Sequence, residues 1–279
     1  LLFLVICKID GNKVFSTNKA ALKKSKSVSG VSSKISFGVP EFSKSQNNFT
    51  QLDQQNHNID KDEFQCVNDG QQITWQDTIF TCEAIDIPNE TQKVALKKTM
   101  ENVRDYLQSI LLVDRLNTPI DITTSLEGYF NLADSPNPIS DTDIYLSVFI
   151  RTYGDSQTLA SAHYVTTDSE TYRPIQGAIY VNSRYLPTEA QNENSTNTDF
   201  FYTVVLEIMH ALGVSSDSFP YYHPKDSTTP YESPLAELND EATGKKHTFL
   251  VTPFSHRFAV IQWGVENFTV NGVTVPSGI

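Results

Sequence analysis

A five-residue stretch, Leu206-Glu207-Ile208-Met209-His210, places residues that can do chemistry at helical spacing. In the pattern His-Glu-x-x-His, two His four residues apart share one face of a helix and bind zinc. The Glu beside the first His then acts as general base on the zinc-bound water. Here Glu207 and the second His are present, and Leu206 stands where the first His belongs. The predicted function therefore depends on whether a zinc site can exist with Leu206 in place of the first His.

The residues around this stretch predict the element that positions it. Residues 199–213 are almost continuously apolar, which predicts a buried helix. Thr198 or Asp199 can cap its first turn, and Gly213 can end it. The polar residues 186–198 before it are expected to form an exposed loop.

The elements before this helix indicate an α+β fold. A clear helical period over residues 91–116 predicts an amphipathic helix on the core. Residues 144–150 predict a central strand, and residues 158–165 and 177–181 predict two more, with a turn at 172–177. A further helix is expected from Ser255 to Trp263. The predicted core positions of the first helix are Leu96, Met100, Val103, Leu107, Ile110 and Leu111.

The order of these signals resembles the leishmanolysin family of zinc metallopeptidases, a branch of the metzincins. Five stretches of roughly residues 60–279 carry the resemblance. They are the strand at 141–150, the alanine-rich strand at 160–165, Arg173-Pro-Ile-Gln-Gly-Ala-Ile-Tyr-Val-Asn182, the helix at 205–215, and Leu250-Val-Thr-Pro253 with Asn271-Gly-Val-Thr-Val-Pro276.

This resemblance implies a metzincin-like N-terminal subdomain over residues 61–214, with a mixed β-sheet and a buried active-site helix. A loop-rich, incomplete C-terminal subdomain would follow over residues 215–279. The family's third zinc His and its Met-turn are expected beyond residue 279. The resemblance also implies a strand bordering the substrate cleft, and in an active peptidase an extended peptide would pair near this strand. Its residues are Gly177, Ala178, Ile179, Tyr180 and Val181.

The departures from the family predict a protein without peptidase activity. A catalytic zinc takes three protein ligands and a water. Leu206 offers no lone pair, so His210 becomes a vestigial ligand and Glu207 a vestigial general base. We therefore expect no cofactor. The alternative is an active zinc metalloendopeptidase with zinc ligands that are rearranged, drawn from the remaining histidines, or outside this sequence. The histidines considered, otherwise expected to be ordinary surface or loop residues, are His163, His223 and His256.

Two classes of function remain open. The first is a leishmanolysin-like secreted or surface protein that binds a protein partner or peptide at the former cleft, as an adhesion, coat or assembly protein. The second is the active metalloendopeptidase, which includes the case of a chain with His at position 206, since one base separates the codons. A third, unspecific reading is an unrelated secreted glycoprotein.

Charge limits the class of partner. The net charge is -12 and the isoelectric point about 4.9, which argues against nucleic acid and anionic membrane surfaces. Residues 1–50 hold eight Lys against Asp10 and Glu41, a net charge of +6, which leaves -18 for the rest. Residues 8–60 read as a polar basic arm or pro-region. Membrane association is expected only through an anchor beyond residue 279.

Several signals favour the secretory pathway. Residues 1–7 are all apolar and read as the end of a signal peptide, with a buried strand as the alternative. Four Asn-x-Ser/Thr glycosylation motifs occur, at Asn48, Asn89, Asn194 and Asn267.

Cysteine usage agrees with an oxidising compartment. If Cys7 leaves with the signal peptide, Cys66 and Cys82 remain as a pair around a turn at residues 68–70 and strands at 73–75 and 78–80. A disulfide between them is the prediction, and two free buried thiols are the alternative.

Overall fold

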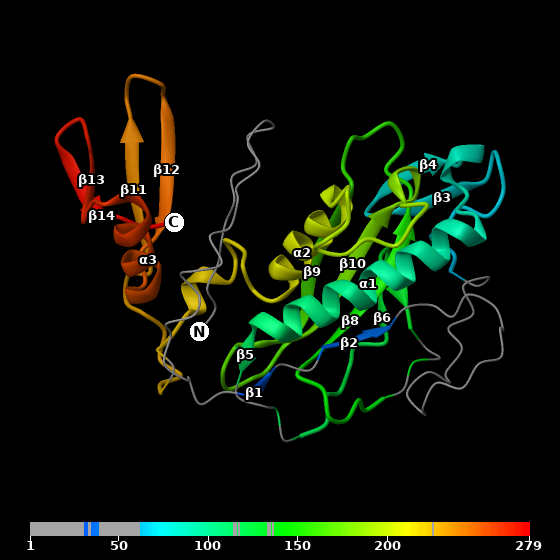
Figure 1. The fold of residues 1–279 in the computed structure, drawn as a ribbon, viewed down its shortest axis with the longest axis horizontal. Coiled ribbons are helices and arrows are strands. Elements are labelled where there is room, and N and C mark those ends of the chain that lie inside the picture. Colours follow the sequence, from blue (N-terminus) through cyan, green and yellow to red (C-terminus); the bar gives the residue numbers. More distant parts are fainter. Residues whose placement is uncertain are drawn as a thin grey trace. The chain divides into compact units, whose positions relative to one another are not determined.

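The chain has an α+β fold in which several small sheets accompany few helices (Figure 1). The computed structural model describes residues 31–32, 35–38 and 62–279, apart from 114, 115, 117, 133, 134, 136 and 225. Its compact units are residues 30–213 and 214–279, and each is described by itself. The signal-peptide prediction for residues 1–7, Cys7 and the motif at Asn48 lie outside the described residues.

The first unit is built on a four-stranded mixed sheet in the order β2-β8-β10-β9. The strands are β2 (Ile35–Gly38), β8 (Ile144–Arg151), β9 (Ala160–Thr167) and β10 (Pro174–Asn182). β2 and β10 run parallel to β8, and β9 runs antiparallel to β10. Every residue of β8 is buried, which confirms the predicted central strand.

Part of the predicted basic arm belongs to this sheet. Ile35 and Phe37 alternate with small residues in β2, the period of a strand. β1 (Val31–Ser32) pairs with β5 (Leu112–Val113) in a separate two-stranded sheet. Residues 31–32 and 35–38 thus form short strands, and the interpretation of residues 8–60 as a polar basic arm or pro-region stays a prediction.

The predicted amphipathic helix is α1 (Glu90–Ile110). Asn89 caps it by accepting from the Gln92 backbone N–H, and the Gln92 side chain accepts from the Asn89 backbone N–H in return. The helix ends at Ile110, which is 53% exposed, while Leu111 is buried just beyond the helix. The assignment of Ile110 to the core face was wrong because consecutive residues of a helix point in different directions.

The second predicted helix is α2 (Asp199–Ala211). Its N-cap residue, Thr198, makes no side-chain capping bond. The third backbone N–H of the helix, that of Phe201, instead donates to the Gln191 side chain at 3.1 Å. Gln191 is also tied to α1, since its N–H donates to Thr99 and its carbonyl accepts from Asn102. This part of the predicted exposed loop is therefore bonded to both helices.

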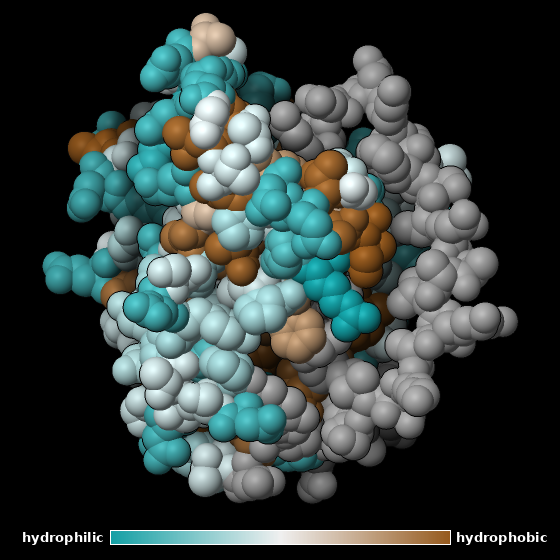
Figure 2. Space-filling view, turned by 90° about the vertical axis from the view of Figure 1, so that its left-hand side faces the viewer, coloured by the Kyte–Doolittle hydropathy of each residue, from teal (hydrophilic) through white to brown (hydrophobic). Residues whose placement is uncertain are grey.

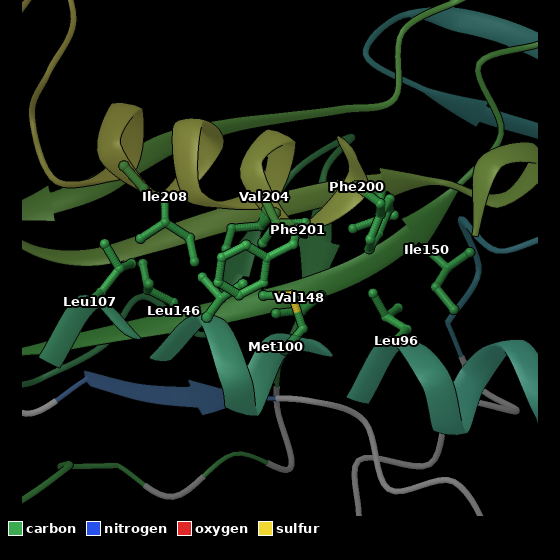
Figure 3. Close-up of a cluster of buried hydrophobic side chains, with 14 of the residues drawn as sticks. Leu96, Met100, Leu107, Leu146, Val148, Ile150, Phe200, Phe201, Val204 and Ile208 are labelled. Carbon is green, nitrogen blue, oxygen red and sulfur yellow. The ribbon is translucent and has the colours of Figure 1, made fainter. Parts of the chain in front are cut away.

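Both helices pack on the same face of the sheet (Figures 1 and 3). The core between them is mainly aliphatic, with side chains from α1, β8, β10 and α2 that are almost wholly buried. The residues labelled in Figure 3 are Leu96, Met100, Leu107, Leu146, Val148, Ile150, Phe200, Phe201, Val204 and Ile208.

The opposite face of the sheet is covered by short hairpins. They are β3 (Gln72–Trp75) with β4 (Thr78–Thr81), and β6 (Ser125–Leu126) with β7 (Phe130–Asn131). Cys66 and Cys82 form a disulfide with a Cα–Cα distance of 5.7 Å. The predicted pairing is therefore present, and its two sulfur atoms lie in the core of this face.

Two 3-10 turns close the first unit near the end of β10. They are η3 (Ala84–Asp86) and η4 (Ser183–Tyr185). Arg184 joins them, because its guanidinium bonds the buried Asp86 carboxylate at 2.7 Å. Burial alone would raise the pKa of Asp86, but hydrogen bonds from Arg184, the Glu83 N–H and Thr152 outweigh it and lower that pKa.

The second unit contains two hairpins and a helix, so the expectation of a loop-rich C-terminal part was wrong beyond residue 234. After η5 (Phe219–Tyr221) come β11 (Leu235–Asp240) paired with β12 (Lys245–Leu250), α3 (Pro253–Trp263), and β13 (Asn267–Val270) paired with β14 (Val273–Pro276). Glycine at 244 and 272 takes the positive φ that the two hairpin turns require.

Exposed apolar groups occur in both units. Apolar residues reach the surface among polar ones (Figure 2). Ile261 and Trp263 of α3 are 74% and 57% exposed. In the part of the chain that is described, no helix combines the length and the apolar character that crossing a bilayer requires.

Candidate functional site

The five-residue stretch lies in the middle and last turn of α2. Leu206 and His210, four residues apart, share one helix face as the spacing predicts. Leu206 is 42% exposed, whereas Glu207 and His210 are half-buried and Ile208 is wholly buried in the core. The helix therefore directs Ile208 inward and carries the predicted site residues toward its flank and surface.

The residues present do not fit a catalytic zinc. Leu206 has only carbon atoms beyond its backbone, and a catalytic zinc takes three protein ligands. Among residues 62–279, apart from the few not described, no three His, Cys, Asp or Glu side chains gather closely enough to hold a metal ion. We therefore derive no step through a metal, and the expectation that no cofactor is bound stays a prediction.

Glu207 lies beside the sheet. Its carboxylate lies near the backbone N–H of Ala162 in β9. Burial raises the pKa of Glu207, although His210 and the Ala162 N–H act in the opposite direction.

The strand register identifies which side of β9 faces away from β10. In the described part of the sheet β9 is the last strand, with β10 on one side. The Leu159 carbonyl accepts from the Asn182 N–H, so the backbone groups of residue 159 face β10. Alternation then turns Ser161 and His163 toward β10, and Ala160, Ala162 and Tyr164 away from it. β9 therefore presents backbone donors and acceptors at a sheet edge, beside α2.

The predicted cleft strand occupies a different place. Residues 177–181 lie within β10, which pairs with β8 on one side and β9 on the other. The backbone groups of Gly177, Ala178, Ile179, Tyr180 and Val181 are thus used inside the sheet, and no peptide can pair with them. The prediction was wrong about pairing because sequence order does not reveal strand order, and β9 enters the sheet outside β10.

Gly177 has a role in this site nonetheless. A Cβ atom added there would lie 2.8 Å from Leu146 Cδ2 and 2.9 Å from Ala211 Cβ, closer than carbon atoms pack. Only glycine lets the last turn of α2 approach β10 this closely. Gly177 therefore sets the distance between the helix that carries Glu207 and the sheet that carries Ala162.

His163 lies on the face of the sheet opposite α2. Its ring stacks on Tyr180, with 5.6 Å between centroids, and this pair continues a row through Phe149 to Phe130 with centroids 5.5 and 5.4 Å apart. Burial lowers the pKa of His163. His163 is half-buried, and it faces away from His210.

Tyr153 supports the start of β9 on the same face. Its hydroxyl lies 2.7 Å from Ser161 Oγ and donates to the Tyr180 carbonyl oxygen at 3.3 Å. Burial raises the pKa of Tyr153 to about 12, so the phenol stays protonated and neutral at physiological pH. Trp75 packs against it edge to face at 5.1 Å. These contacts fix the strand whose outer edge is open.

The other candidate histidines belong to the second unit. His223 Nδ1 lies 2.8 Å from the Pro224 carbonyl oxygen in an exposed loop. His256 Nδ1 lies 2.8 Å from the Ser277 carbonyl oxygen, and its Nε2 lies 3.3 Å from the Glu266 carboxylate. His256 therefore links α3 to the residues around the last hairpin.

Sequence reasoning missed the β9 backbone as part of the site. Backbone donors carry no residue signature, and Ala162 is an ordinary small residue in a strand. One signal was available, because residues 160–167 contain no Lys, Arg, Asp, Glu or Pro. Natural edge strands usually carry such residues to prevent pairing with other chains.

Comparisons with known proteins identify no family. No protein-family model matches the chain, and no curated protein matches it significantly. The leishmanolysin-like relationship therefore stays a prediction from the sequence.

Proposed function

We propose that this protein is a leishmanolysin-like binding protein that no longer acts as a zinc peptidase. In this proposal it works in the secretory pathway, outside the cell or at its surface. Its partner contributes an extended segment that pairs with the outer edge of β9, next to α2. The segment adds a strand to the sheet, as in β-augmentation.

The observation that carries the proposal is the open edge of β9. Ala162 and Tyr164 turn their backbone groups away from β10, and the strand has no charge or proline to discourage pairing. Backbone hydrogen bonds supply affinity in this mode of recognition without a metal. Gly177 and the Tyr153 hydroxyl hold the neighbouring elements in place, so the edge is preformed.

Position 206 supports binding rather than hydrolysis. Leu206 supplies no metal ligand, and the Glu207 carboxylate lies near the Ala162 N–H of β9. A general base must instead face the water that it activates. The arrangement keeps the helix beside the sheet edge and places its carboxylate near the strand.

Two observations support the secretory pathway in this proposal. The Cys66–Cys82 disulfide persists in an oxidising compartment. Of the four glycosylation motifs, Asn89, Asn194 and Asn267 are exposed and can accept a glycan. The Asn89 carbonyl oxygen can still cap α1 when its amide nitrogen carries a glycan.

Metal content tests the loss of the zinc site. The purified protein, dialysed at neutral pH, is analysed for zinc, and its hydrolysis of unfolded casein is measured with and without added zinc. The proposal expects substoichiometric zinc and no zinc-dependent hydrolysis. Folding is checked by circular dichroism, so that an unfolded sample is not mistaken for an inactive one.

Near-stoichiometric zinc together with casein hydrolysis would overturn the proposal in favour of the active metalloendopeptidase. In that case the substitutions His163→Ala, His223→Ala and His256→Ala identify the replacement ligand by loss of zinc. Glu207→Gln then abolishes hydrolysis if Glu207 acts as general base. A folded, zinc-free protein without zinc-dependent casein hydrolysis would be consistent with the proposal.

A further inference from the structure

A row of stacked rings crosses the face of the sheet that lies opposite α2. It takes one ring from each of three neighbouring strands, Phe149 of β8, Tyr180 of β10 and His163 of β9. The ring centroids are 5.5 Å apart in the first pair and 5.6 Å apart in the second, with interplanar angles of 19° and 28°. These separations are slightly larger than the ~4.8 Å between neighbouring strands. The row therefore advances by one ring per strand.

The two ends of this row differ. Phe130 of β7 stacks on Phe149 at 5.4 Å and is only 1% exposed, so the row is closed at this end. His163 forms the other end, on the last strand of the described sheet, and it is half-buried. Tyr129, which is also half-buried, meets the His163 ring edge to face at 5.8 Å. The row therefore ends on a partly exposed ring at the open edge of β9.

A strand that pairs with β9 brings its side chains into line with the row. His163 turns its backbone groups toward Ala178 of β10, so an added antiparallel strand meets His163 in a non-hydrogen-bonded pair. The side chains of such a pair lie closer together than those of a hydrogen-bonded pair, and they point to the same face of the sheet. The partner residue opposite His163 therefore projects beside its ring, on the face away from α2.

The surroundings of this position favour a ring over an aliphatic side chain. Burial lowers the pKa of His163, so its imidazole is neutral at physiological pH. A neutral ring offers a face for offset stacking, which adds to the apolar area that any large side chain buries. The neighbouring β9 residues on this face offer no ring, because Ser161 is bonded to the Tyr153 hydroxyl at 2.7 Å and Val165 is aliphatic. The preference should therefore be confined to one position of the partner.

We propose that the β9 edge selects extended segments with Phe or Tyr opposite His163, whose ring adds one more member to the stacked row. This inference rests on the proposed binding function and names the side chain by which the partner is recognised. The observation that carries it is the continuity of the row, which is closed at Phe130 and open at His163. The β9 backbone supplies affinity, and His163 is a specificity-determining residue.

The experiment compares three fluorescein-labelled peptides with the sequence Thr-Val-Thr-X-Thr-Val-Thr, where X is Phe, Leu or Ala. Binding to the full chain is followed by fluorescence anisotropy at neutral pH. We expect the Phe peptide to bind about fivefold more tightly than the Leu peptide, and the Ala peptide to bind most weakly.

N-methylation of the Phe peptide tests the pairing and its register. When X lies opposite His163, the N–H groups of the two Thr beside X face β9, whereas those of the two Val face away from it. Methyl groups on the nitrogens of these two Thr should abolish binding. Methyl groups on the nitrogens of the two Val should leave binding in place.

Three variants assign the preference to one ring. His163→Val removes the ring at the edge, and the Phe and Leu peptides should then bind alike. His163→Phe keeps a ring and should keep the preference. Tyr202→Val is the matched control and should keep the preference too, because it removes a ring that is 42% exposed but packs toward α1, against Tyr106 at 6.4 Å. Thermal unfolding shows that each variant is folded.

The ring signals of His163 in the wild-type protein give a direct readout of stacking. They are recorded by NMR on protein with isotope-labelled histidine and are assigned by their absence from the spectrum of His163→Phe. The ring current of a stacked Phe should move these signals upfield when the Phe peptide binds. The Leu peptide should move them much less.

The outcomes separate the inference from the function on which it rests. Equal affinities for the Phe and Leu peptides would overturn the selectivity and leave edge binding intact. A preference that survives in His163→Val, or that disappears equally in Tyr202→Val, would overturn the role of His163. No binding by any peptide, or binding that methylation of the two Thr leaves unchanged, would overturn edge binding and with it the inference.

Discussion

The two faces of the central sheet differ in chemistry. The face under α1 and α2 is filled mainly by aliphatic side chains, whereas the opposite face holds stacked rings, a disulfide and a buried arginine. β8 divides them, because Leu146 and Val148 point to the helices while Phe149 points away. The comparison shows that two kinds of contact hold the edge strand β9, aliphatic packing on one face and ring contacts and hydrogen bonds on the other.

The two faces differ in how strictly their contacts fix the positions of the side chains. Aliphatic packing is non-directional and tolerates exchange of similar volumes. Rings, hydrogen bonds and ion pairs have preferred geometries, so they fix one arrangement. We infer that the aliphatic face holds α2 near the sheet, and that the polar and aromatic face fixes β9 through Tyr153 and His163.

The largest expected difference between the faces follows from Arg151. Its side chain is wholly buried, donates to Asp62 at 2.6 Å and to the Tyr129 carbonyl at 3.1 Å, and lies 4.8 Å from the centre of the Phe149 ring. Arg151→Met leaves these acceptors without a donor, so we expect the free energy of unfolding to fall by about 3 kcal/mol. Urea unfolding measures it.

The matched control on the helix face is Met100→Leu. Met100 is also wholly buried, but its neighbours are apolar. A swap of similar volume should cost less than about 1.5 kcal/mol. Equal losses for the two substitutions would contradict the distinction between directional and non-directional packing.

Elements that depend on local periodicity could be predicted from the sequence. The apolar period predicted the start of α1 to within one residue, but it placed the end at residue 116, six residues beyond the observed end, and put Ile110 on the core side. The run at 144–150 predicted a buried central strand. Cys66 and Cys82 flank a turn and a hairpin, which brings them together locally. These features are decided by residues close in sequence.

The site could be predicted only in part because it depends on contacts distant in sequence. The spacing of Leu206 and His210 on one helix face followed from helix geometry. The proximity of Glu207 to Ala162 brings together residues 45 positions apart, and a backbone group has no sequence signature. Strand order also decides which strand is open, and hydrophobic patterns of β9 and β10 do not encode it.

An intermediate effect is expected from Gly177→Ala, which tests the contact between helix and sheet. The added methyl group meets Leu146 and Ala211 at less than 3 Å, so we expect a loss of about 1–3 kcal/mol in urea unfolding. Peptide binding at the β9 edge should weaken as well, because α2 must shift.

Ala211→Gly provides the matching partner in a double-mutant cycle. It removes one of the two clashes but adds glycine to a helix, which costs about 1 kcal/mol. The loss in the double variant should therefore be smaller than the sum of the single losses. Strict additivity would mean that α2 does not meet the sheet at this point.

The smallest expected effect is on the pH dependence of stability, and it is tested with one titrating group from each face. Burial lowers the pKa of His163 from its usual 6.5. As the pH falls, the unfolded chain therefore binds a proton at His163 at a higher pH than the folded protein does. The stability that neutral His163 maintains is present above pH 6.5 and is lost as pH falls toward the lowered value. Burial raises the pKa of Glu207 from 4.5, so its effect is opposite, complete below pH 4.5 and lost as pH rises through the raised value.

Urea unfolding at a series of pH values, with variant and wild type measured together, separates the two groups. His163→Phe keeps a ring in the stack and should remove only the loss of stability below pH 6.5. Glu207→Gln keeps the shape of the side chain without its charge and should remove only the loss that begins above pH 4.5. If both substitutions changed the pH profile in the same direction, His163 and Glu207 could not occupy the environments described for the two faces. Opposite changes would show that the strand between them is sensitive to acid on one face and to base on the other.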